Sequence, residues 1–189
     1  PAILDQLIAL CHKYDVLCIA DEVMTGFGRT GTIFASNQLQ EQPDIMAMSK
    51  GLTGGTLPLS LTTCTAEVFD AFYSDDKMKA LFHGHSYTAN PVGCAAALAS
   101  LDLLESEACQ ADIQRIVQQH QTFQEKISGH PALVRVEQTG TILAIEFATP
   151  SATSYFNQLR DKLYYFFLKR DILLRPLGNV IYILPPYCM

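Results

Sequence analysis

Two short apolar runs in the first third of the chain each lead into a charged residue. Residues 16–20 are followed by Asp21. Residues 45–48 lead, through one serine, into Lys50. Short continuous apolar runs are typical of strands buried on both faces of a parallel sheet. Because the carboxyl ends of such strands meet where α/β sheets bind ligands, we expect an α/β fold with an acid and an amine over one crevice.

The remaining chain is dominated by helical periodicity. Asn90 and Pro91 suit the N-cap and first position of one helix. Helices are predicted over residues 3–14, 92–104, 108–128 and 152–170. Further strands are predicted at 59–64, 134–136, 142–147, 172–174 and 180–184. Strand–helix alternation up to about residue 106, followed by a smaller α+β pattern, predicts two domains, 1–106 and 107–189.

Charge and composition exclude several classes of protein. The 189 residues carry a formal net charge of −6, and no basic run is present, so a nucleic-acid or anionic-membrane partner has no electrostatic support. No apolar run reaches the roughly 20 residues that span a bilayer, and no signal peptide opens the chain. We expect a cytoplasmic protein.

The cysteines and the chain ends add two further expectations. Six cysteines occur without a C-x-x-C pair, several inside apolar runs, which favours reduced, buried thiols. The chain begins with Pro1 rather than methionine and stops just after an apolar strand pattern. Both ends are therefore expected to be cuts through a longer protein.

Several motifs admit more than one interpretation. GFGRTG, residues 26–31, matches a dinucleotide-binding pattern, but five residues separate it from the strand and a poor helix opening follows it. His83 and His85 have no evident third ligand nearby, so no metal site is expected. Arg175, at the end of an apolar run, suits either bidentate carboxylate binding or a surface salt bridge.

An acid and an amine at neighbouring strand ends meet the needs of pyridoxal-phosphate (PLP) chemistry. A lysine such as Lys50 can form a Schiff base with the cofactor aldehyde. A carboxylate such as Asp21 can keep the pyridine nitrogen protonated, which makes the ring an electron sink. The lysine amine is then placed to carry a proton as general base and acid.

Three stretches together resemble the class III PLP-dependent aminotransferases. They are IADEVMTGFGRTGTIFA at 19–35, PDIMAMSKGLTGGTLPLS at 43–60 and HGHSYTANPVGCAAALASL at 83–101. The resemblance implies the type I PLP fold, with part of the large, mostly parallel-sheet domain and a truncated small α+β domain. It also implies a homodimer with active sites at the subunit interface, and a phosphate loop upstream of Pro1.

The resemblance also implies roles for individual residues. Lys50 matches the catalytic Schiff-base lysine, and Asp21 matches the partner of the pyridine nitrogen. Ser86, with His85 beside it, stands where the family binds the PLP phosphate of the neighbouring subunit. The implied cofactor-binding residues are Asp21, Lys50, His85 and Ser86; the implied substrate-binding residues are Gly84, Arg175 and Tyr182.

Within the class, SKGLTGGTLPLSLTT and RPLGNVIYILPPY most resemble the members that act in biotin biosynthesis. This likeness implies transfer of an amino group from S-adenosylmethionine to 8-amino-7-oxononanoate, with Arg175 holding the carboxylate of the acceptor. Two alternatives stay open at this point. One is another class III transaminase acting on an ω-amino acid, ornithine or a diamine, and the other is a truncated, non-catalytic piece.

Overall fold

The computed structural model describes residues 2–189 of the chain. It divides into two compact units, one ending at Ser106 and the other spanning Glu107–Met189. Each unit contains its own three-stranded sheet. Over the described residues, no helix combines the length and the apolarity that a membrane span requires.

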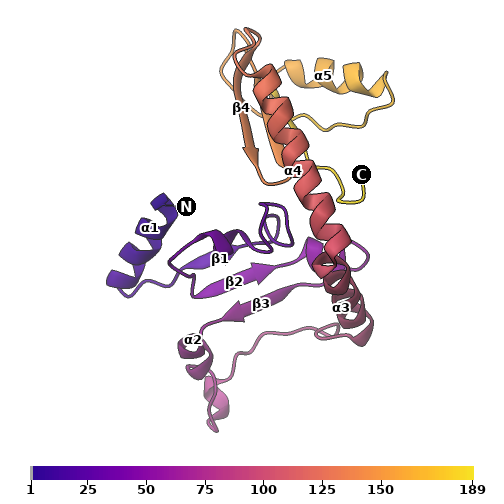
Figure 1. Ribbon diagram of the computed structural model, residues 1–189. Helices are drawn as coiled ribbons and strands as arrows, with labels where there is room; N and C mark the ends of the chain where they lie inside the picture. The colour runs from indigo at the N-terminus through magenta and orange to yellow at the C-terminus, as the bar shows by residue number, and fades with distance from the viewer. Residues whose placement is uncertain (1) are drawn as a thin grey trace. The chain divides into compact units, whose positions relative to one another are not determined.

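The first unit is built on a mixed sheet whose strand order is β1-β2-β3 (Figure 1). β1 and β2 are parallel neighbours, with Asp21 opposite Ala47, and β3 is antiparallel to β2. The expectation that the two apolar runs form parallel strands of one sheet is therefore confirmed. The helix and strands are α1 (Ala2–Lys13), β1 (Ile19–Asp21), β2 (Ile45–Met48) and β3 (Leu61–Cys64).

Helices and short 3₁₀ turns connect these strands and follow them. The predicted start of α3 is confirmed, because the Asn90 side chain accepts the Gly93 N–H at 2.7 Å and Pro91 is the first helical residue. The helices are α2 (Ala66–Asp70) and α3 (Pro91–Glu105), and the 3₁₀ turns are η1 (Ala35–Gln38), η2 (Lys50–Thr53) and η3 (Lys77–Lys79).

Burial of the first apolar run is the main point at which the prediction was wrong. Only three residues form β1, and Leu17 and Ile19 are 58% and 67% exposed. Among the described residues β1 pairs with β2 alone, so it is an edge strand with nothing across its outer side. Of α1, only Ile8 is buried. All six cysteines are free thiols, but the expectation that they are buried was wrong, because four are half-buried and Cys64 and Cys188 are exposed.

The second unit is an antiparallel sheet packed against one long helix. The strand order is β4-β5-β6, and α4 contacts β4 and β5. Ile113 on the helix and Leu143 and Ile181 on the strands are almost completely buried. Figure 1 shows these elements in colours that run from red through orange to yellow: α4 (Glu107–Ile127), β4 (Leu133–Thr139), β5 (Ile142–Phe147), α5 (Leu159–Leu168) and β6 (Val180–Ile183).

One predicted element of this unit is shorter than expected, and another does not form. The helix predicted from residue 152 begins at Leu159, because buried Asn157 bonds to Thr149 and Ser151 through its Nδ2 and accepts the Leu159 N–H through its Oδ1. These bonds hold the preceding residues in a loop. Residues 172–174 form no strand. Only a single bridge joins Leu177 to Val180, and Pro176 has no N–H with which to continue the ladder.

Candidate active site

The carboxyl edge of the β1–β2 pair carries the predicted acid and amine. Hydrogen bonding continues one residue past β1, since the Glu22 N–H donates to the Ala47 carbonyl at 2.9 Å. Asp21 is the last residue of β1, and its Oδ1 accepts the Val23 N–H at 3.0 Å. Lys50 lies three residues beyond Ala47, at the start of η2. Both side chains are exposed, at the same edge of the sheet.

The backbone of Lys50 is strained. Its φ of +46° lies in the left-handed region, which costs a residue with a side chain roughly 1–2 kcal/mol. Neighbouring bonds hold the turn in place: Ser49 Oγ donates to the Leu59 carbonyl at 2.8 Å, and the Gly55 N–H donates to the Lys50 carbonyl at 3.2 Å. Strain that the surroundings maintain in this way is characteristic of functional sites.

The glycine-rich loop packs directly against this turn. A Cβ on Gly51 would lie 2.7–2.9 Å from three atoms of Phe27, which is 8% exposed and sits edge-to-face on Phe34. From the other side, Ser100 Oγ of α3 donates to the Gly51 carbonyl at 3.1 Å. The residues after GFGRTG form turns rather than a helix, as the sequence predicted. The loop therefore helps to fix the residue next to Lys50.

Replacing Gly51 with alanine should displace this turn, because Phe27 is buried and cannot move aside freely. We expect proper folding but a loss of turnover of about a hundredfold, the cost of misplacing a reacting group by about 1 Å. Steady-state kinetics of Gly51→Ala would measure it. The double variant Phe27→Ala/Gly51→Ala removes the ring that the new methyl meets, so it should recover part of the rate. If the loss of turnover in the double variant equals the sum of the losses in Phe27→Ala and Gly51→Ala, the contact between residue 51 and the Phe27 ring is not the cause.

Glu22 is a buried carboxylate that the sequence analysis did not single out. It is 2% exposed, and it accepts the Ser36 N–H at 2.7 Å, the Ala35 N–H at 3.1 Å and the Thr25 hydroxyl at 2.5 Å. Burial acts to raise the pKa of Glu22, but these hydrogen bonds outweigh it, so the pKa lies below its ordinary value. Glu22 closes the loop of residues 22–36 beside Asp21. Its only sequence signal is its place next to that residue.

The segment before α3 contributes to a separate open cavity of about 690 Å³. Gly84 and His85 line it together with Leu59 and with Ser49, the residue before Lys50. Ser86 is exposed and is not part of this lining. His85 is tied into its own turn, since its Nδ1 accepts the Tyr87 N–H at 3.1 Å. Among residues 2–189, no cluster of three metal-ligating side chains includes His83 or His85.

Arg175 and Tyr182 belong to the second unit, on the two arms of one turn. An antiparallel bridge joins Leu177 to Val180. Arg175 lies two residues before this bridge, and Tyr182 lies two residues after it. Gly178 makes the turn possible: its φ is +61°, and a Cβ there would lie 1.7 Å from the Ser154 carbonyl oxygen. Arg175 is exposed, while Tyr182 is half-buried opposite Ala144 of β5.

This fold and the order of these motifs are those of a known enzyme class. A family profile described as Aminotransferase class-III matches residues 1–189. The chain belongs to the class III aminotransferases. Its structural neighbours are class III transaminases, which have the type I fold. This chain forms part of the α/β domain of that fold, followed by a second unit.

Within that family, several similar proteins share one name. The adenosylmethionine-8-amino-7-oxononanoate aminotransferase of Synechococcus elongatus is 46% identical over 100% of this chain and 44% of its own length. Others of the same name are 35–43% identical. The crystal structure of the Methanocaldococcus jannaschii protein of that name superposes with a TM-score of 0.88 at 34% identity, over 97% of this chain and 44% of that one.

The solved structure of a transaminase that is named for a different substrate class is also similar. An (S)-enantioselective omega-transaminase from Thermomicrobium roseum gives a TM-score of 0.87 at 31% identity, over 97% of this chain and 41% of its own. The chain thus spans less than half the length of the relatives it matches.

Proposed function

We propose that the protein carrying this chain is a PLP-dependent aminotransferase of biotin biosynthesis. It transfers an amino group from S-adenosylmethionine to 8-amino-7-oxononanoate, giving 7,8-diaminononanoate. The single observation that carries the proposal is the shared carboxyl edge of the parallel strands β1 and β2, where Asp21 ends β1 and Lys50 begins the turn that follows β2. The printed names of relatives up to 46% identical support the choice of substrates.

The residues at this edge fit the cofactor. PLP presents an aldehyde and a pyridine nitrogen, and when bound it supplies an electron sink for removal of the substrate α-proton. Asp21 would hold a proton on the pyridine nitrogen. Lys50 would bond to the aldehyde carbon and, once released by the substrate amine, move a proton between substrate carbon and cofactor. The exposure of both side chains leaves them accessible to a ligand.

Further contacts complete the proposed site. Ser86, with His85 beside it, would donate a hydroxyl to the phosphate of PLP held by a second subunit, so the working form is a homodimer. Gly84 would line the substrate site through its backbone. Arg175 would hold the far carboxylate of the oxononanoate with its planar fork, and Tyr182 would flank it. We place the protein in the cytoplasm, in line with its reduced cysteines.

Two half-reactions test this proposal. The PLP-loaded protein should convert to its amino form with S-adenosylmethionine and return to the PLP form with 8-amino-7-oxononanoate, both visible in the cofactor absorption spectrum. The likeness to an omega-transaminase favours one competing substrate class, ω-amino acids and simple amines. Conversion by such amines but not by S-adenosylmethionine would overturn the biotin assignment and leave the aminotransferase assignment intact.

Replacing Arg175 with alanine should separate the two substrates. We expect the KM for the oxononanoate to rise about tenfold to a hundredfold, because a charge-assisted bidentate pair contributes about 1.5–3 kcal/mol. The half-reaction with S-adenosylmethionine should change little. Single-turnover kinetics on each half-reaction would measure both effects. Arg135→Ala, on the exposed face of β4, is the matched control. Equal losses in both half-reactions would argue against the role of Arg175.

A further inference from the structure

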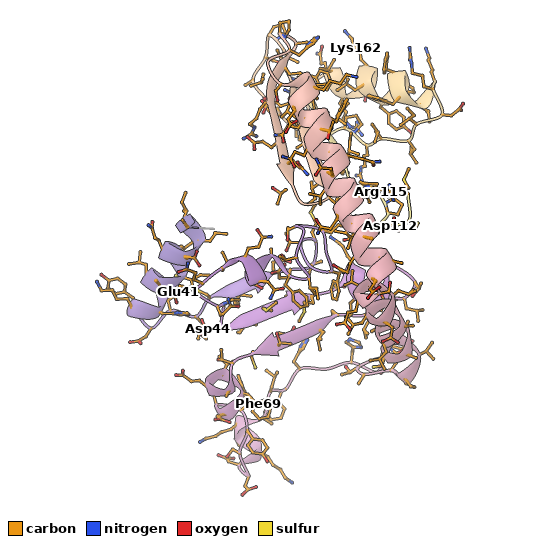
Figure 2. All side chains as sticks on the ribbon, viewed as in Figure 1. Glu41, Asp44, Phe69, Asp112, Arg115 and Lys162 are labelled. Carbon is orange, nitrogen blue, oxygen red and sulfur yellow. The ribbon has the colours of Figure 1, made fainter. Side chains whose placement is uncertain are left out.

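Three metal-ligating side chains meet at the amino ends of β1 and β2, away from the edge that carries Lys50. They are His12 on the last turn of α1, Cys18 just before β1 and Asp44 just before β2. Their ligand atoms all lie within 4.8 Å of one another. Figure 2 labels Asp44, which projects at the end of β2 near α1.

The backbone holds this cluster together before any ligand binds. The Asp44 and Ile45 N–H groups donate to the Cys18 carbonyl at 2.9 and 3.1 Å, and the Cys18 N–H donates to Asp44 Oδ2 at 2.7 Å. His12 Nε2 lies 3.2 Å from the same oxygen. The amino ends of β1 and β2 and the carboxyl end of α1 are thereby held around the carboxylate of Asp44.

The turn after α1 brings the last residues of that helix to the amino end of β1. Asp15 has a φ of +54°, and its N–H and that of Val16 donate to the carbonyls of His12 and Cys11. This left-handed turn reverses the chain within a few residues. The turn therefore places the His12 side chain beside Cys18 and Asp44.

The donor set matches one kind of ion. Imidazole, thiolate and carboxylate all bind Zn²⁺, and donors at about 2.0–2.3 Å around a tetrahedral zinc are separated by roughly 3.3–3.8 Å. Modest side-chain rotations bring the cluster to that spacing. Charge also balances, since one thiolate and one carboxylate neutralise a divalent cation. Ca²⁺ and Mg²⁺ prefer all-oxygen sites and do not fit.

We propose that His12, Cys18 and Asp44 form a Zn²⁺ site, completed by one water molecule, that clamps the end of α1 to the β1–β2 pair. Binding replaces the Cys18 thiol proton by the metal and releases that proton to solvent. The site lies at the opposite ends of the strands from Asp21 and Lys50, so its role is to tie α1 to the sheet rather than to touch substrate. The expectation of no metal concerned His83 and His85 alone; His12, Cys18 and Asp44 are far apart in sequence and come together only through the fold.

Metal titration of the full protein, without a histidine tag and reduced with a non-thiol reagent, tests this site. After removal of bound metal, Zn²⁺ added against a chromophoric chelator should bind with one equivalent per chain. Co²⁺ should give a thiolate-to-cobalt charge-transfer band. We expect Cys18→Ser and His12→Gln each to weaken Zn²⁺ binding by at least about tenfold and to lose the rise in Tm that Zn²⁺ gives the unchanged protein.

Matched controls are Cys64→Ser on exposed β3 and His130→Gln in the second unit, which should bind Zn²⁺ unchanged. His12 is exposed, so its replacement should leave folding intact and keep the test informative. Absence of the cobalt band, or equal Zn²⁺ affinity in Cys18→Ser, would show that the cluster is only an ion pair beside a thiol. Neither result depends on aminotransferase activity.

Discussion

Replacing Lys50 with alanine is expected to reduce aminotransferase turnover by at least about a thousandfold. Under the proposed function, the variant loses both the amine that would bond to the cofactor aldehyde and the base that would move the substrate proton. Borohydride reduction of the PLP-loaded protein, followed by peptide mass mapping, should find the cofactor attached at residue 50 in the unchanged protein. In Lys50→Ala no such attachment should form.

The structure separates this chemical loss from unfolding. Lys50 is exposed and its backbone is strained, so alanine removes no buried contact and the Tm should stay close to that of the unchanged protein. Lys77→Ala and Lys79→Ala, in exposed η3, should retain full turnover and the adduct at residue 50. Repeated turnover by Lys50→Ala would refute the assignment of this lysine.

Elements with strong local signals could be predicted from the sequence. The Asn90–Pro91 start of α3 and the strands β2 and β5 follow from capping and apolar pattern alone. Parallel pairing then places Asp21 and Lys50 at one edge, because register and strand direction leave no other arrangement. The positions of residues at the ends of adjacent strands can therefore be predicted from the sequence.

Features that depend on particular neighbours or on particular turn hydrogen bonds could not be predicted in the same way. The exposure of Ile19 reflects the absence of a neighbour on one side of β1 among the described residues, which a local pattern cannot reveal. The late start of α5 depends on the bonds of Asn157, and the His12, Cys18 and Asp44 cluster depends on a left-handed turn at Asp15. At Asn157, local side-chain hydrogen bonds override the helical periodicity.

The buried hydrogen bonds of Glu22 could not be predicted from the sequence either. Replacing this residue should have a large effect on the free energy of unfolding. Glu22→Gln keeps the shape of the side chain but turns one acceptor into an NH₂ donor. Its oxygens receive the N–H groups of Ser36 and Ala35, so one buried N–H would face another donor. We expect a loss of about 2–4 kcal/mol in the free energy of unfolding, measured by denaturant titration.

The control and the pH dependence test the cause of that loss. Glu67→Gln, on exposed α2, should change stability by less than about 0.5 kcal/mol. Because the folded-state pKa of Glu22 is lowered, the stabilisation by its carboxylate is complete above the ordinary glutamate pKa and declines as the pH falls through the lowered value. Glutamine does not titrate, so the stability gap between the two proteins should narrow on acidification. A gap that stays constant from neutral pH to the acid limit of folding would mean that the loss comes from the introduced NH₂ donor and not from the missing charge of the carboxylate.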